Sequence, residues 1–117
     1  CTASSRLVVH ESIHDEFVDR MQKSTSALKV GHALEEGTQI GPASSEEQLA
    51  SNLKYMDLAR EEGCEVVCGG EHLELKTPGF YMQPALLIGG NNSMRVNREE
   101  LFAPMACVIK VKDYDEA

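Results

Sequence analysis

Two apolar runs, at residues 7–10 and 105–111, are the features that most limit how this chain can fold. Neither run alternates regularly between polar and apolar side chains, and both contain β-branched residues. Such strands are typical of a sheet buried on both faces, because an exposed face would place polar residues at every second position. The runs therefore predict an α/β fold in which helices flank a largely parallel sheet.

Two amphipathic helices are expected between these strands. Apolar residues recur at helical spacing over residues 13–28, and again from residue 49 to residue 59. Ser44 and Ser45 each begin a capping-box pattern ahead of the second helix, and Gly63 is suited to end it. Glycines and a proline at 37–42 predict a loop between the two helices.

The remaining segments are shorter. We expect a strand at 65–68, a surface loop or edge hairpin at 71–76, a strand at 80–88, a short helix or turn at 94–100 and the first turn of a helix at 113–117. Pro84 cannot donate a backbone hydrogen bond, so it is expected to place its strand at a sheet edge or to split it.

Composition limits the classes of function. The 117 residues suit one domain with one core, and 19 acidic against 11 basic residues give a formal net charge of -8. An acidic surface repels phosphate backbones, so nucleic acid is not an expected partner. The sequence contains no apolar run of membrane-spanning length and no recognisable signal peptide, so we expect no membrane association and a cytoplasmic location.

The four cysteines are not spaced as metal ligands or as a disulfide framework. Cys64 and Cys68 flank a short strand and Cys107 lies in an apolar run, so we interpret these three as packing residues and expect no metal site. Cys1 differs, because four small residues follow it ahead of the strand at 7–10. A cysteine in such a turn is a candidate nucleophile.

A second candidate for chemistry lies in Glu99-Glu100-Leu101-Phe102-Ala103-Pro104. Its two carboxylates and its aromatic ring stand between a loop and a strand. The alternative interpretation is structural, with the glutamates as a solvated surface pair and Phe102 as a core anchor.

Both segments are similar to signatures of the aldehyde dehydrogenase family. Residues 1–6 resemble the segment that begins at the family's nucleophilic cysteine, and residues 99–104 resemble its second signature. The order of the two motifs and their separation also resemble the family, and the resemblance covers essentially the whole chain. Ala103 departs from it, because the family usually has glycine there, and glycine's conformational freedom is lost beside the expected cofactor site.

The resemblance implies a reaction and a role for each motif. An NAD- or NADP-dependent enzyme would oxidise an aldehyde to a carboxylic acid through a thiohemiacetal and a thioester on Cys1. Thr2 would lie beside the substrate, Glu100 would bind the nicotinamide-ribose hydroxyls and Phe102 would lie near the nicotinamide. The parent enzyme would be a homo-oligomer, either a dimer or a tetramer. Residues 27–42 and 95–117 are most similar to the ketoglutarate-semialdehyde dehydrogenase branch, which would make the substrate a semialdehyde.

The resemblance also implies that residues 1–117 are only part of a catalytic domain. In the family, the oxyanion-hole asparagine, the general-base glutamate and the Rossmann-type cofactor domain precede the cysteine, and the oligomerisation strands lie elsewhere. None of these is recognisable in this sequence. We therefore expect the chain alone to bind NAD weakly and not to turn over.

Two other functions stay open from the residues themselves. If Cys1 were a mature N-terminus, its α-amine could act as the base for its own thiol, as in N-terminal-nucleophile hydrolases. The other alternative is a folded, non-catalytic interaction module.

Overall fold

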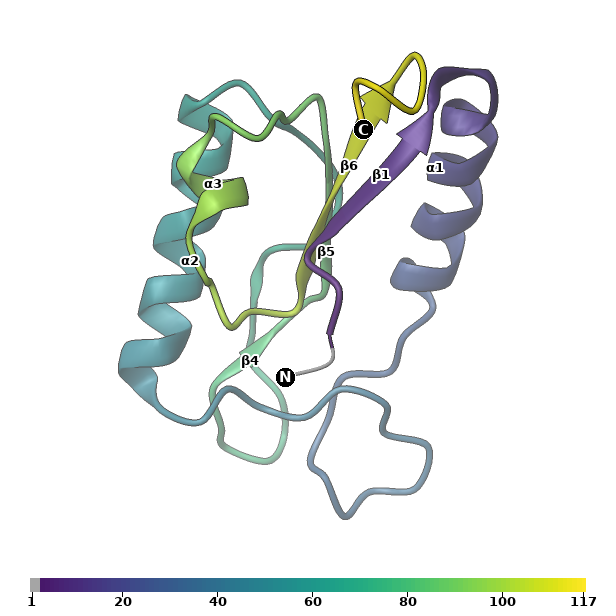
Figure 1. The fold of residues 1–117 in the computed structure, drawn as a ribbon. Helices are drawn as coiled ribbons and strands as arrows, with labels where there is room; N and C mark the ends of the chain where they lie inside the picture. The colour runs from purple at the N-terminus through teal and green to yellow at the C-terminus, as the bar shows by residue number, and fades with distance from the viewer. Residues whose placement is uncertain (1–2) are drawn as a thin grey trace.

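The computed structural model describes residues 3–117 (Figure 1). Its elements are, in chain order, β1 (Arg6–His10), α1 (Glu11–Ser26), α2 (Glu46–Glu61), β2 (Glu65–Cys68), β3 (His72–Leu73), β4 (Tyr81–Met82), β5 (Ala85–Ile88), α3 (Arg95–Arg98) and β6 (Met105–Val111). The strands predicted at 7–10, 65–68 and 105–111 are confirmed. No helix within residues 3–117 is long and apolar enough to cross a membrane.

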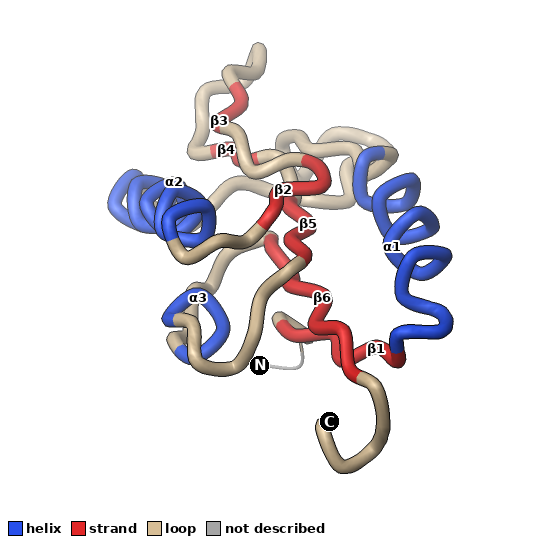
Figure 2. Tube along the Cα trace, turned by 90° about the horizontal axis from the view of Figure 1, so that it is seen from above, coloured by secondary structure: helices blue, strands red, loops and turns tan. Residues whose placement is uncertain are grey.

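Four strands form the main sheet in the order β1-β6-β5-β2. Strand β6 pairs in parallel with β1 on one side and with β5 on the other, whereas β2 pairs antiparallel with β5. Figure 2 shows α1 on one face of this sheet and α2 with α3 on the other. The predicted α/β fold, with a largely parallel sheet and flanking helices, is confirmed.

Each face of the sheet packs against its own helix layer. Leu86 and Val108 belong to the core beneath α1, whereas their neighbours Leu87 and Ile109 belong to the core beneath α2. Successive side chains of a strand point to opposite faces, so a sheet covered on both faces needs apolar residues at successive positions. This arrangement explains the continuous apolar run of β6. Strand β1 lies at the sheet edge, where only Val9 is buried and Val8 is 46% exposed, so the expectation of burial on both faces is wrong for residues 7–10.

Capping side chains set where the two long helices begin. Ser45, and not Ser44, is the N-cap of α2, since its hydroxyl accepts a hydrogen bond from the Gln48 N–H at 3.2 Å. Helix α1 begins two residues earlier than predicted, because His10 Nδ1 accepts the Ser12 N–H at 3.2 Å. Histidine is not among the residues that usually cap helices, so the sequence carried no clear signal for this start.

Pro84 splits the segment expected to form one strand at 80–88. The part before it, β4, pairs with β3 in a separate two-stranded sheet, which confirms an edge hairpin around 71–76. The part after it, β5, lies between β6 and β2, so the alternative of an edge strand is wrong. The proline lies before the first residue of β5, where its missing N–H costs the main sheet nothing.

The C-terminal segment differs from the prediction. Residues 113–117 form turns instead of the first turn of a helix. The Asp113 carboxylate accepts the Glu116 N–H at 2.9 Å, and the Glu116 carboxylate accepts the Lys112 N–H at 2.7 Å. These side chains satisfy backbone donors locally, as acidic residues often do in turns.

Two buried thiols pack beneath the loop that joins β5 to α3. Cys64 and Cys107 are free, and the Asn97 amide nitrogen lies 3.6 Å from Cys107 Sγ. Burial, and then the nearby Cys107 thiol, raise the pKa of Cys64 to about 11, so its thiol is neutral at physiological pH. The prediction that these cysteines are packing residues is confirmed, and Cys68 also packs, on the α1 side of the sheet.

Replacing Gly90 with alanine is expected to destabilise the fold by roughly 1–3 kcal/mol. A Cβ there would lie 2.6 Å from Cys107 Sγ and 2.7 Å from Asn97 Nδ2, so buried side chains would have to shift. Gly41→Ala is the matched control, since a Cβ at that position meets nothing within 4 Å. Urea unfolding followed by circular dichroism measures both variants, and equal stabilities would contradict this packing.

Candidate active site

The segment ahead of β1 is fixed against β6. The Ser5 carbonyl accepts a hydrogen bond from the Cys107 N–H at 2.8 Å, and this bond places residues 3–5 at the edge of the sheet where β6 begins. Cys1 and Thr2, the predicted nucleophile and substrate-binding residue, lie outside the described residues.

The second motif forms the loop between α3 and β6. Phe102 has φ 54°, in the left-handed region that is sterically costly for a bulky side chain. Backbone hydrogen bonds hold the loop immediately after it, from the Met105 N–H to the Ala103 carbonyl and from the Ala85 N–H to the Pro104 carbonyl, both at 2.8 Å. Strain of this kind persists only where the surroundings enforce it, and it is concentrated at functional sites.

Phe102 is not a core anchor, because 70% of its surface is exposed. The structural alternative for this residue is therefore wrong.

The replacement of the family's usual glycine by Ala103 does not disturb the backbone in the way that was expected. Among residues 3–117, Phe102 is the only non-glycine residue with positive φ, so the backbone at Ala103 does not require glycine's freedom.

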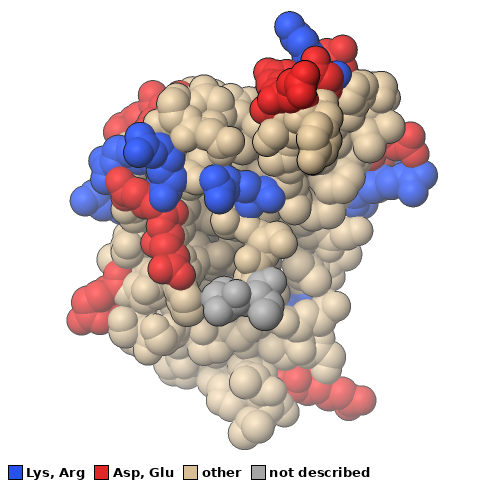
Figure 3. Space-filling model, in the orientation of Figure 1, with Lys and Arg blue, Asp and Glu red and all other residues tan. Residues whose placement is uncertain are grey.

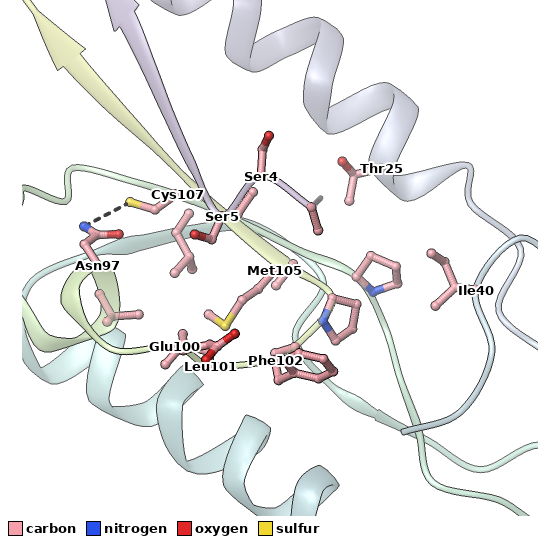
Figure 4. Close-up of a pocket in the computed structure, with 18 of the residues that line it drawn as sticks. Ser4, Ser5, Thr25, Ile40, Asn97, Glu100, Leu101, Phe102, Met105 and Cys107 are labelled. Atoms are coloured by element: carbon pink, nitrogen blue, oxygen red, sulfur yellow. Dashed lines mark hydrogen bonds between the residues drawn. The ribbon is translucent and has the colours of Figure 1, made fainter. Parts of the chain in front are cut away.

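A cavity of about 690 Å³ lies between the two segments. Ser4 and Ser5 line one side, and Glu100 and Phe102 line the other (Figure 4). Strands β1, β5 and β6 are mutually parallel, so their amino ends meet at this edge of the sheet. The structure thus brings the described end of the first motif close to the second motif, although they lie at opposite ends of the chain.

The cavity combines an apolar wall with a few polar groups. Leu101, Phe102 and Met105 contribute apolar surface, and Glu100 supplies a carboxylate. Figure 3 shows uncharged side chains over much of this face of the molecule, with basic and acidic side chains among them. Apolar pockets with a small number of placed polar groups are typical of sites for small molecules and cofactors.

The two neighbouring glutamates lie in different environments. Glu99 is paired: its carboxylate accepts a hydrogen bond from Arg95 Nε at 2.7 Å and another from the Tyr55 hydroxyl. The hydrogen bond from Arg95, followed by that from Tyr55, lowers the pKa of Glu99. Within residues 3–117, no hydrogen-bond donor pairs with the Glu100 carboxylate, which is exposed at the cavity and free to accept hydrogen bonds from a ligand.

Sequence reasoning missed both partners of Glu99. The four-residue spacing between Arg95 and Glu99 is a signal that could have revealed the first. Tyr55 lies on α2, far away in sequence, and no local pattern links it to this loop.

Comparisons with known proteins agree with this geometry. The model of the aldehyde dehydrogenase family matches residues 1–117. The chain is 42% identical over 117 residues to the chloroplastic betaine aldehyde dehydrogenase of Atriplex hortensis, and 43% identical over 120 residues to an aldehyde dehydrogenase of Rhodospirillum rubrum. All of this chain is covered in both cases, but only 23% and 24% of these relatives.

Solved structures show the same likeness. The NAD+ complex of the aldehyde dehydrogenase from Bacillus cereus superposes with a TM-score of 0.93 at 30% identity, covering 99% of this chain and 23% of that one. The chain therefore spans about a quarter of the length of the proteins it matches. Since the family model matches its entire length, the chain belongs to the aldehyde dehydrogenase family.

Proposed function

We propose that this chain supplies the cysteine-bearing part of the catalytic domain of an NAD-dependent aldehyde dehydrogenase. The observation that carries the proposal is the cavity at the amino ends of β1, β5 and β6. The segment that follows Cys1 and the loop that carries Glu100 and Phe102 both line it. Because the relatives are about four times longer, the activity is proposed for a polypeptide of their length that contains this segment, and residues 1–117 alone are not expected to turn over.

The residues around the cavity fit one end of a nicotinamide dinucleotide. The carboxylate of Glu100, which accepts no hydrogen bond from residues 3–117, is an acceptor-only group suited to the two hydroxyls of a ribose. The exposed ring of Phe102, carried by a residue with a constrained backbone, offers a flat apolar surface to a nicotinamide. NAD is proposed because the Bacillus cereus relative was solved with NAD+.

Cys1 is the proposed nucleophile. Its thiolate forms a C–S bond with the aldehyde carbon, and the carbonyl oxygen becomes the alkoxide of a thiohemiacetal. A bound nicotinamide would supply the acceptor for the hydride that leaves that carbon. Cys1 then carries the acyl group as a thioester, and attack by water releases the carboxylic acid and restores the thiol. Thr2 is proposed to lie beside the aldehyde.

Location, assembly and substrate branch are also proposed. A cytoplasmic location is proposed because the sequence contains no apolar run of membrane-spanning length, and assembly into a dimer or tetramer because of the family resemblance. The ketoglutarate-semialdehyde branch is supported by the similarity of residues 27–42 and 95–117 to that branch.

Cys1→Ala is expected to lower NAD-dependent aldehyde oxidation by about a thousandfold or more, because no other group can carry the acyl intermediate. NADH formation at 340 nm measures this in a polypeptide of the relatives' length. Cys68→Ala is the control, since Cys68 packs on the α1 side of the sheet and should leave the rate unchanged. The other enzyme class needs a chain that begins at Cys1, so the 117-residue chain is incubated with amides: Cys1-dependent hydrolysis that needs no NAD would instead indicate an N-terminal-nucleophile hydrolase.

Glu100→Gln is expected to raise the KM for NAD by about three- to tenfold, because an amide is a weaker acceptor for ribose hydroxyls than a carboxylate. The KM for the aldehyde should stay within about twofold of the wild-type value. Glu74→Gln, an exposed change in the β3–β4 hairpin, serves as the control. An unchanged KM for NAD in Glu100→Gln would remove Glu100 from the cofactor site.

A substrate panel tests the proposed branch. A semialdehyde that bears a carboxylate should have a kcat/KM at least about tenfold above those of betaine aldehyde and acetaldehyde, since one charge-assisted contact contributes about that factor. A preference for betaine aldehyde or acetaldehyde would reject the branch while leaving the family unaffected.

A further inference from the structure

Three polar side chains on α2 reach towards the loop that carries the second motif. Gln48, Tyr55 and Glu62 are spaced seven residues apart, which places them along one face of the helix and its C-cap. Each contacts the segment 95–101. We call these three residues the α2 polar stripe.

The first contact of the α2 polar stripe holds the start of α3. Glu62 accepts hydrogen bonds from the Arg95 N–H at 2.8 Å and from the Val96 N–H at 3.1 Å. The residue at the N-cap position of α3, Met94, offers no capping side chain. Glu62 therefore satisfies from another helix two donors that a short helix leaves unpaired.

The second contact holds Glu99. The Tyr55 hydroxyl donates to one carboxylate oxygen of Glu99, and Arg95 donates to both oxygens, at 2.7 Å and 3.3 Å. Glu99 has an extended backbone, with φ -92° and ψ 148°. Because successive side chains of an extended chain point in opposite directions, a Glu99 side chain anchored on α2 directs Glu100 away from α2.

The third contact lies on the other side of Glu100. Gln48 Nε2 donates to the Leu101 carbonyl at 3.2 Å and to Asn52 Oδ1 at 2.7 Å. Asn52 is 1% exposed, so the Gln48 amide is held by a buried partner. Glu100 is thus bracketed by two residues, Glu99 and Leu101, that are both tied to α2.

We propose that Tyr55 and Gln48 are positioning residues that set the orientation of Glu100 and Phe102 towards the nicotinamide ribose. This inference rests on the proposed function. The two residues act through Leu101 and Glu99, which flank Glu100. The lowered pKa of Glu99 keeps its carboxylate charged at neutral pH, and the pKa of Tyr55 is raised chiefly by the hydrogen bond to Glu99, so the donor and the acceptor both persist.

The test is Tyr55→Phe in a polypeptide of the relatives' length, because this change removes one hydroxyl and keeps the ring. The KM for NAD should rise about three- to tenfold, while the KM for the aldehyde and the thermal unfolding midpoint stay near their wild-type values. Hydrogen exchange of the backbone amides of 99–103 should become faster. Tyr114→Phe is the matched control, since Tyr114 is 93% exposed and follows the carboxyl end of β6, whereas this loop precedes its amino end.

A double variant that changes both Tyr55 and Gln48 completes the test. The double variant Tyr55→Phe with Gln48→Met should raise the KM for NAD more than either single change. An unchanged KM for NAD in an active Tyr55→Phe enzyme would overturn the positioning role alone. Equal losses in both KM values together with a lower unfolding midpoint would also overturn it, because they would indicate a purely structural role. A wild-type enzyme that oxidises no aldehyde with NAD would overturn the proposed function and this inference together.

Discussion

Parallel pairing of β6 with both β1 and β5 is the constraint on which the rest of the structure depends. Three strands that run in the same direction begin at the same edge of the sheet. The segments that lead into them, residues 3–5, Pro84 and the loop 99–104, therefore meet there. Main-chain hydrogen bonds from Cys107 to Ser5 and from Ala85 to Pro104 fix that meeting at 2.8 Å each. The cavity between residues 3–5 and the loop 99–104 lies where these strand starts meet.

The loop at this edge is strained where it faces the cavity and held where it faces α2. Phe102 is an exposed aromatic residue in a left-handed conformation, an arrangement that contributes nothing to the core. The polar side chains of α2 and the backbone bonds of β6 hold the residues on either side of it. The proposed role of Phe102 beside the nicotinamide would be a physical reason to maintain such a conformation.

The elements could be predicted from sequence where local patterns determined them. The apolar runs at 7–10 and 105–111 identified strands, of which only the second is largely buried, and Ser45 marked the start of α2. Local patterns failed where a side chain competed unexpectedly for the backbone, as His10 does at α1 and Asp113 does near the end of the chain. The position of β5 inside the sheet depends on its pairing with β6 and β2, and the spacing of apolar residues along the sequence does not predict which strands pair.

The same distinction applies to the site. Its motif residues were recognisable because their types and order resemble a family, but the partners of Glu99 were not, since Tyr55 reaches it from another helix.

The most direct test of the proposed cofactor site is a crystal structure, with NAD+ bound, of a polypeptide as long as the relatives. We expect the Glu100 carboxylate to accept hydrogen bonds from the nicotinamide-ribose hydroxyls, with the nicotinamide between Phe102 and the Cys1 sulfur. A dinucleotide bound with its ribose remote from Glu100 would contradict it.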